Sequence, residues 1–124
     1  MAQPNGGGAD SAFLSGQLIS GSFAAAGQSA VAVFYGSFNI SLWGTFVGTV
    51  RLERSFDGGT TWLPLSVDLA GTNLQWTQPY SGYPWAEVEH TVPYRLNCTA
   101  YTSGTVNYRM SQTSDVVWVG GTSR

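Results

Sequence analysis

The chain has 124 residues, a formal net charge of −2, 14% aromatic residues and only 10% charged residues. This length fits one domain with a core of its own, and the lack of lysine leaves no basic stripe for nucleic acid. The single cysteine excludes an internal disulfide, and we expect neither a signal peptide nor a membrane span. A surface with so few charges predicts that partner proteins cover part of it. The alternative is a monomer that Ser, Thr and Asn side chains keep soluble.

The first half of the chain predicts an arm followed by strands. Residues 1–16 are rich in Gly and predict a flexible N-terminal arm, ahead of a β-sandwich domain over 17–113 and a C-terminal tail over 114–124. Period-two alternation predicts strands at 28–35, 37–44 and 45–56. The residues expected to face the core from the last two strands are Phe38, Ile40 and Leu42, then Phe46, Val50, Leu52 and Phe56.

The octet SFDGGTTW, residues 55–62, resembles the Asp-box of sialidases and other β-propeller enzymes. A propeller blade takes roughly 40 to 50 residues, so this chain is too short for a propeller. Asp and Gly favour tight turns, and short polar side chains can accept hydrogen bonds from turn amides. We therefore interpret the octet as a structural hairpin turn built from Ser55, Asp57, Gly59, Thr61 and Trp62. We expect Asp57→Ala to destabilise the fold and to leave binding by the folded protein unchanged.

Residues 61–69 predict the return strand, with Pro64 indicating a sheet edge or a bulge, and residues 73–78 predict another short strand. The loop at 76–85 then concentrates aromatic side chains. They fit three interpretations: a stacking platform for a sugar ring, anchors in a protein interface, or a lid on one end of the core. The candidate interface residues are Trp76, Tyr80, Tyr83 and Trp85 from this loop, and Trp118 from the tail.

Residues 93–101 and 105–112 predict a second hairpin. Its connecting loop is expected at 102–104, with Gly104 in the left-handed conformation. This pairing would place Arg95, Asn97 and Arg109 together on the outer face. The residues expected to point inward are Tyr94, Leu96, Cys98 and Ala100, then Val106, Tyr108 and Met110. About eight short strands joined in this way predict an all-β protein, an antiparallel β-sandwich, with a small β-barrel as the alternative.

The sequence offers little for catalysis, so we expect a protein that is not an enzyme and needs no cofactor or metal. His90 and Cys98 lie on one predicted strand, roughly 25 Å apart if it is extended, and Cys98 falls in the inward phase, where a thiol is inert. Glu87 and Glu89 share one face of that strand. They indicate either a cation site or, more simply, a solvated strand face.

Two stretches, GTFVGTVRLERSFDGGTTWLPL and YRLNCTAYTSGTVNYRMSQ, resemble the small β-sandwich proteins that tailed bacteriophages encode among their virion genes. The resemblance covers about residues 36–112. It implies a virion component made in the host bacterial cytoplasm, foremost a capsid decoration (cement) protein on the outer shell. It also implies contacts with the major capsid protein or other virion proteins. The low charge and the exposed aromatic candidates separately predict a homo-oligomer or docking on a repeating lattice, and the charge and hydropathy predict no nucleic-acid or membrane partner.

Other members of that group belong to necks, tails or fibres. A second reading is a carbohydrate-binding module that uses the aromatic loop, although Gln75, Gln78 and Ser81 are its only polar neighbours in sequence. Cementing requires reach beyond a small domain, and an extended arm provides it. We therefore expect deletion of residues 1–12 to leave the domain folded and to weaken its attachment to the particle.

Overall fold

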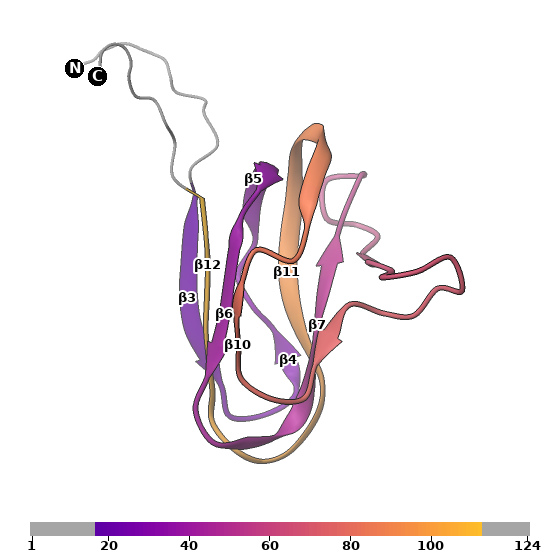
Figure 1. Cartoon of the computed structure of the whole chain (residues 1–124). Helices are drawn as coiled ribbons and strands as arrows, with labels where there is room; N and C mark the ends of the chain where they lie inside the picture. The colour runs from indigo at the N-terminus through magenta and orange to yellow at the C-terminus, as the bar shows by residue number, and fades with distance from the viewer. Residues whose placement is uncertain (1–16, 113–124) are drawn as a thin grey trace, which may run out of the picture.

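The computed structural model describes residues 17–112, which form two packed antiparallel β-sheets (Figure 1). One sheet has four strands, in the order β10 (Tyr80–Gly82), β6 (Asn39–Trp43), β12 (Val106–Ser111) and β3 (Leu18–Phe23). The other has six: β4 (Gly27–Gln28), β11 (Ala86–Gly104), β7 (Phe46–Arg54) and β8 (Leu63–Pro64), with β5 (Ala32–Ser37) paired to β11 and β9 (Gln75–Trp76) paired to β7. The prediction of an all-β sandwich is confirmed, with short strands more numerous than expected.

The core lies between the two sheets and follows the period-two alternation of the strands. The four-stranded sheet contributes Phe23, Ile40, Leu42, Val106, Tyr108 and Met110. The six-stranded sheet contributes Ala32, Phe34, Val50, Leu52, Val92, Tyr94, Leu96 and Cys98. Phe38, in the turn from β5 to β6, stacks on Phe34 with 4.3 Å between ring centroids. Most of the residues expected to point inward are therefore buried.

The predicted hairpin between 93–101 and 105–112 is wrong. β11 pairs with β7, β5 and β4, whereas β12 pairs with β3 and β6 in the opposite sheet. Gly104 has the expected positive φ of 88°, and a Cβ there would lie 2.1 Å from the carbonyl oxygen of Thr45. That tight turn sends the chain across the sandwich instead of back along the same sheet. Arg109 consequently lies on a different sheet from Arg95 and Asn97.

Two residues expected in the core are exposed, each for a local reason. The register of β11 against β7 shifts between Cys98 and Ala100, and the extra residue of this bulge turns Ala100 outward. Phe56 follows the end of β7 and is 50% exposed, beneath the guanidinium of Arg54 at 4.9 Å. The expected strand at 28–35 is likewise interrupted between β4 and β5, and the return strand at 61–69 is reduced to β8.

The first and last described residues, Gln17 and Gln112, join the two sheets at one side of the molecule. The backbone N–H of Gln112 donates to the carbonyl of Gln17 at 3.0 Å. The side-chain oxygen of Gln17 accepts from the N–H of Val33 at 2.6 Å, and Gln112 Nε2 donates to the carbonyls of Tyr35 and Ser37. The segments 1–16 and 113–124 are therefore both attached at this one place.

Candidate binding surface

The octet forms the turn between β7 and β8, and its polar groups are used within the turn. Ser55 Oγ donates to Asp57 Oδ1 at 2.8 Å and accepts from the N–H of Gly59 at 2.8 Å. Asp57 Oδ1 also accepts from the N–H groups of Thr60 and Thr61 at 3.1 and 2.7 Å. The hydrogen bond from the backbone of Thr61, followed by those from the Thr61 and Ser55 side chains, lowers the pKa of Asp57 to about 2. The indole Nε1 of Trp62 donates to the carbonyl of Gly59 at 3.0 Å.

Ser55→Ala is expected to lower the free energy of unfolding by about 1 to 2 kcal/mol, because the Gly59 amide loses its acceptor, the buried Ser55 hydroxyl. Thr60→Ala, in the same turn, is the matched control, since it shortens an exposed side chain and keeps the backbone N–H that donates to Asp57. It should change stability by less than about 0.5 kcal/mol. Urea unfolding with an unchanged m-value measures both. Equal midpoints for wild type and Ser55→Ala would contradict this account of the turn.

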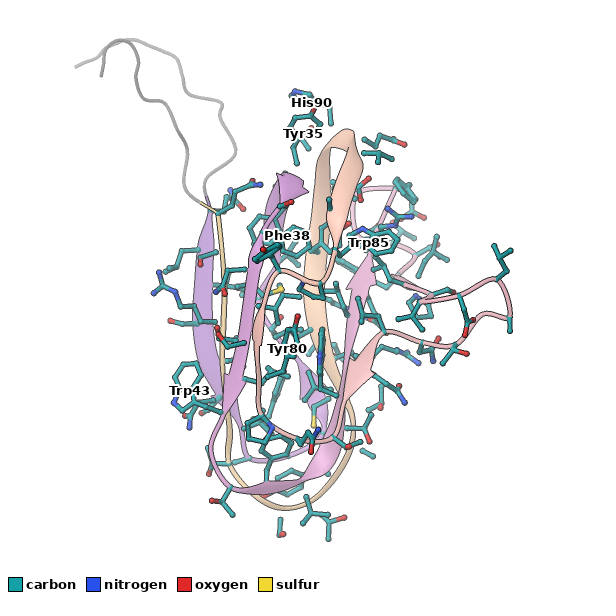
Figure 2. The ribbon with its side chains drawn as sticks, viewed as in Figure 1. Tyr35, Phe38, Trp43, Tyr80, Trp85 and His90 are labelled. Carbon is teal, nitrogen blue, oxygen red and sulfur yellow. The ribbon has the colours of Figure 1, made fainter. Side chains whose placement is uncertain are left out.

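The aromatic side chains of the 76–85 loop do not form one platform. Trp76 and Tyr80 stack with 5.3 Å between ring centroids, and Figure 2 shows Tyr80 pointing in between the sheets. Trp76 and Trp85 are half-buried against the core. Tyr83 alone extends into solvent, with 77% of its surface exposed. Most of this loop therefore covers the core, and Tyr83 is the residue left for contact with a partner.

Tyr83 lines a groove at the end of the sandwich where β3 begins and β12 ends. The groove has a volume of about 680 Å³. We call it the Tyr83 groove. It is lined by Gln17, Leu18, Tyr35, Ser37, Phe38, Asn39, Tyr83, Arg109, Ser111 and Gln112. It thus combines exposed tyrosines with short polar side chains and one arginine. Only Tyr83 was identified as an interface candidate from the sequence, because the other residues come from three separate segments. Trp118, the remaining interface candidate, lies outside the described residues.

A buried carboxylate, Glu53, organises the outer face of the six-stranded sheet. It is only 1% exposed although its side chain points away from the core. It accepts hydrogen bonds from Arg51 at 2.9 and 2.6 Å, Arg95 at 2.9 Å and Asn97 at 3.0 Å. Trp62 packs on the Arg95 guanidinium, 4.4 Å from the ring centroid. Burial alone would raise the pKa of Glu53, but the hydrogen bonds from Asn97, Arg51 and Arg95 outweigh it and hold the pKa below 4.5.

A second buried carboxylate, Glu87, closes one end of the core. Its Oε1 accepts from Arg54 Nη1 at 2.7 Å and from the Tyr94 hydroxyl. The Arg54 guanidinium also lies 5.4 Å from the Trp85 ring centroid. Burial would raise the pKa of Glu87, yet the bonds from Tyr94, the backbone of Glu89 and Arg54 lower it. Burial, reinforced by the bond to Glu87, raises the pKa of Tyr94, so the phenol keeps its proton.

The expectation for Glu87 and Glu89 needs correction. Glu87 is buried and ion-paired, so it belongs neither to a cation site nor to a solvated strand face. Glu89 is exposed, and its backbone N–H donates to Glu87 at 2.9 Å. A bulge in the pairing of β11 with β5, between Glu87 and Val92, separates these neighbours. A prediction from alternating residues assumes an uninterrupted strand, so it does not detect such a bulge.

His90 and Cys98 both lie on β11 and have different surroundings. His90 is exposed and stacks on Tyr35, with 4.7 Å between ring centroids (Figure 2). Cys98 is 1% exposed, and burial raises the pKa of its thiol. Within residues 17–112, no group of three or more His, Cys, Asp and Glu side chains is arranged to hold a metal ion.

Two further observations concern the class of the protein. Among the described residues no helix is long and apolar enough to span a bilayer. In comparisons with protein-family models, curated proteins and solved structures, nothing matched this chain. The fold of the described residues is that of an antiparallel β-sandwich.

Proposed function

We propose that this protein is a structural component of a bacteriophage virion that decorates the outer shell of the capsid by binding the major capsid protein. The resemblance of residues 36–112 to small phage virion proteins supports this assignment. The observation that carries it is the surface of the described sandwich, which exposes many large apolar side chains and carries few charged ones. Surfaces of this kind favour stable contact with other proteins.

Five of the nine charged side chains in residues 17–112 are ion-paired with one another. Arg51, Glu53 and Arg95 are paired in one cluster, and Arg54 is paired with Glu87 in the other. Meanwhile many large apolar side chains are about half exposed or more. They are Leu18, Val31, Tyr35, Trp43, Val47, Phe56, Leu63, Val67, Leu69, Tyr83 and Val88. A protein docked on a shell of identical subunits would remove part of this apolar surface from water.

The Tyr83 groove is the docking surface that the geometry favours. It exposes Leu18, Tyr35 and Tyr83, and aromatic side chains are the usual anchors of protein interfaces. Gln17 and Gln112 also line it, so the segments 1–16 and 113–124 join the sandwich at its rim. One capsid subunit can therefore contact the groove and either flanking segment together.

The test measures occupancy on capsids prepared without this protein. Tyr83→Ala is expected to weaken capsid binding about tenfold or more, as removal of an aromatic anchor does. Leu69→Ala, which truncates a fully exposed side chain in the loop between β8 and β9, is the matched control and should bind like wild type. Deletion of residues 1–12 forms a third arm of the experiment. If Tyr83→Ala occupies capsids as fully as wild type does, the Tyr83 groove is not the docking surface.

A carbohydrate-binding function is the second candidate, because polar side chains do accompany Tyr83 in space. Asn39, Arg109 and Ser111 line the same groove and supply the hydrogen-bonding groups that a sugar ring requires beside an aromatic face. Binding of purified host surface polysaccharide that Tyr83→Ala abolishes, with no binding to capsids, would favour this function over decoration.

A further inference from the structure

The outer edge of β3 is open in the described part of the molecule. β3 pairs with β12 on one side, and no strand among residues 17–112 lies on its other side (Figure 1). The hydrogen bond from Gln112 to Gln17 identifies Gln17 as facing β12. Because facing alternates along an antiparallel strand, Leu18, Ser20 and Ser22 direct their N–H and C=O groups to the open side.

The other sheet edges are short or blocked. β10 has only three residues and lies between Pro79 and Pro84, and β8 has two residues and ends at Pro64. The edge of β5 is longer, but the side-chain amides of Gln17 and Gln112 occupy its backbone groups. β3 differs from all of these.

β3 also lacks the features that discourage pairing with another strand. Its six residues, LISGSF, include no charge and no proline. Natural proteins protect edge strands with Lys, Pro, bulges or covering segments, and an unprotected edge of this length pairs readily with a further strand. The open edge of β3 is therefore a candidate interface.

We infer that β3 pairs antiparallel with β3 of a second copy of this chain, joining the two four-stranded sheets across a two-fold axis at Gly21. Opposite residues of an antiparallel pair point to the same face. This register places Ser20 opposite Ser22 of the second copy on the outer face. On the inner face it places Ile19 opposite Phe23, which extends the apolar layer across the junction.

A second copy suits this edge because nothing in the strand repels itself. A two-fold interface brings the same patch of both subunits together, so any charge on it would meet a like charge. The nearest charge on the outer face is that of Arg109 on β12, which lies directly opposite Ser20 of β3. The two copies of Arg109 would be three strand spacings apart, roughly 14 Å, beyond the screening length at physiological salt.

The experiment uses the full chain alone, so its outcome is independent of capsid binding. Sedimentation velocity of wild type up to about 100 μM should show a concentration-dependent dimer, as a small interface implies. The double variant Ser20→Lys with Ser22→Lys puts new lysines opposite each other and should raise the dimer dissociation constant about tenfold or more. The matched control, Ser20→Lys with Ser22→Glu, puts opposite charges together in this register and should restore dimerisation, more weakly at high salt.

Amide hydrogen exchange of wild type gives a readout that does not depend on a variant folding. The amides of Ser20 and Ser22 should exchange more slowly as protein concentration rises, while that of Val33 should not change. A monomer at every concentration, or concentration-independent exchange at these amides, would overturn the inference. Dimerisation that survives both lysines would place the interface elsewhere.

Discussion

Glu53→Gln is expected to lower the free energy of unfolding by about 2 to 4 kcal/mol, because it leaves two guanidinium groups without their shared counter-charge. The carboxylate accepts four hydrogen bonds from Arg51, Arg95 and Asn97. An amide in its place would direct an NH₂ group towards these donors. The arginines keep about a quarter of their side-chain surface in water, so the loss should fall short of that for a fully enclosed pair.

Glu89→Gln is the matched control, since it makes the same change at an exposed position of β11 and should shift stability by less than about 0.5 kcal/mol. Denaturant unfolding at neutral pH compares the two variants. An unfolding free energy for Glu53→Gln equal to that of Glu89→Gln would show that the cluster contributes nothing to the fold.

The same cluster gives stability a defined pH dependence. The pKa of Glu53 in the folded protein lies below its ordinary value of 4.5, so the folded state binds a proton less readily than the unfolded chain. Its contribution is therefore complete above about pH 4.5 and is lost as pH falls through the lowered pKa. Glu87 follows the same rule. The free energy of unfolding of Glu53→Gln should accordingly fall less steeply than that of wild type as the pH is lowered below about 4.5.

Arg54→Met is expected to cost about 3 kcal/mol, because it leaves Glu87 charged, buried and without its cation. The Tyr94 hydroxyl and the Glu89 amide still donate to that carboxylate, which limits the loss. The guanidinium also packs over Phe56 and Trp85, and methionine preserves part of this apolar contact.

A double-mutant cycle separates the ion pair from the packing. Adding Glu87→Gln to Arg54→Met removes the unpaired charge, so the double variant should be more stable than the sum of the single effects predicts. A coupling free energy of about 1 to 3 kcal/mol is expected from thermal or urea unfolding. Strict additivity would mean that Arg54 and Glu87 act independently, contrary to their contact in the structure.

The sequence predicted those parts of the fold that depend on local pattern. Alternation around Ile40 and Leu42, and again around Tyr94 and Leu96, identified the buried faces because side chains on a strand alternate strictly. The positive φ of Gly104 was predicted from a three-residue hairpin loop, and it is confirmed although that hairpin does not form. What the pattern could not supply was the partner of β12, because a tight turn serves a hairpin and a crossing between sheets equally well.

The site was harder to predict than the fold because its residues meet only in three dimensions. Leu18, Tyr35, Tyr83 and Arg109 come from distant segments to form one groove. The Glu53 cluster had one local signal, since Arg51 and Glu53 are two residues apart and must share a face of β7. The third member, Arg95, required the register between β7 and β11, which pairs it with Glu53.

The number of copies of this chain per virion tests the proposed function most directly. Quantitative mass spectrometry of purified particles would measure its ratio to the major capsid protein. A decoration protein repeats with the symmetry of the shell, so the account predicts a fixed ratio close to one copy per capsid subunit. A few copies per particle would place the chain in a tail or fibre, and its absence from particles would contradict a virion role altogether.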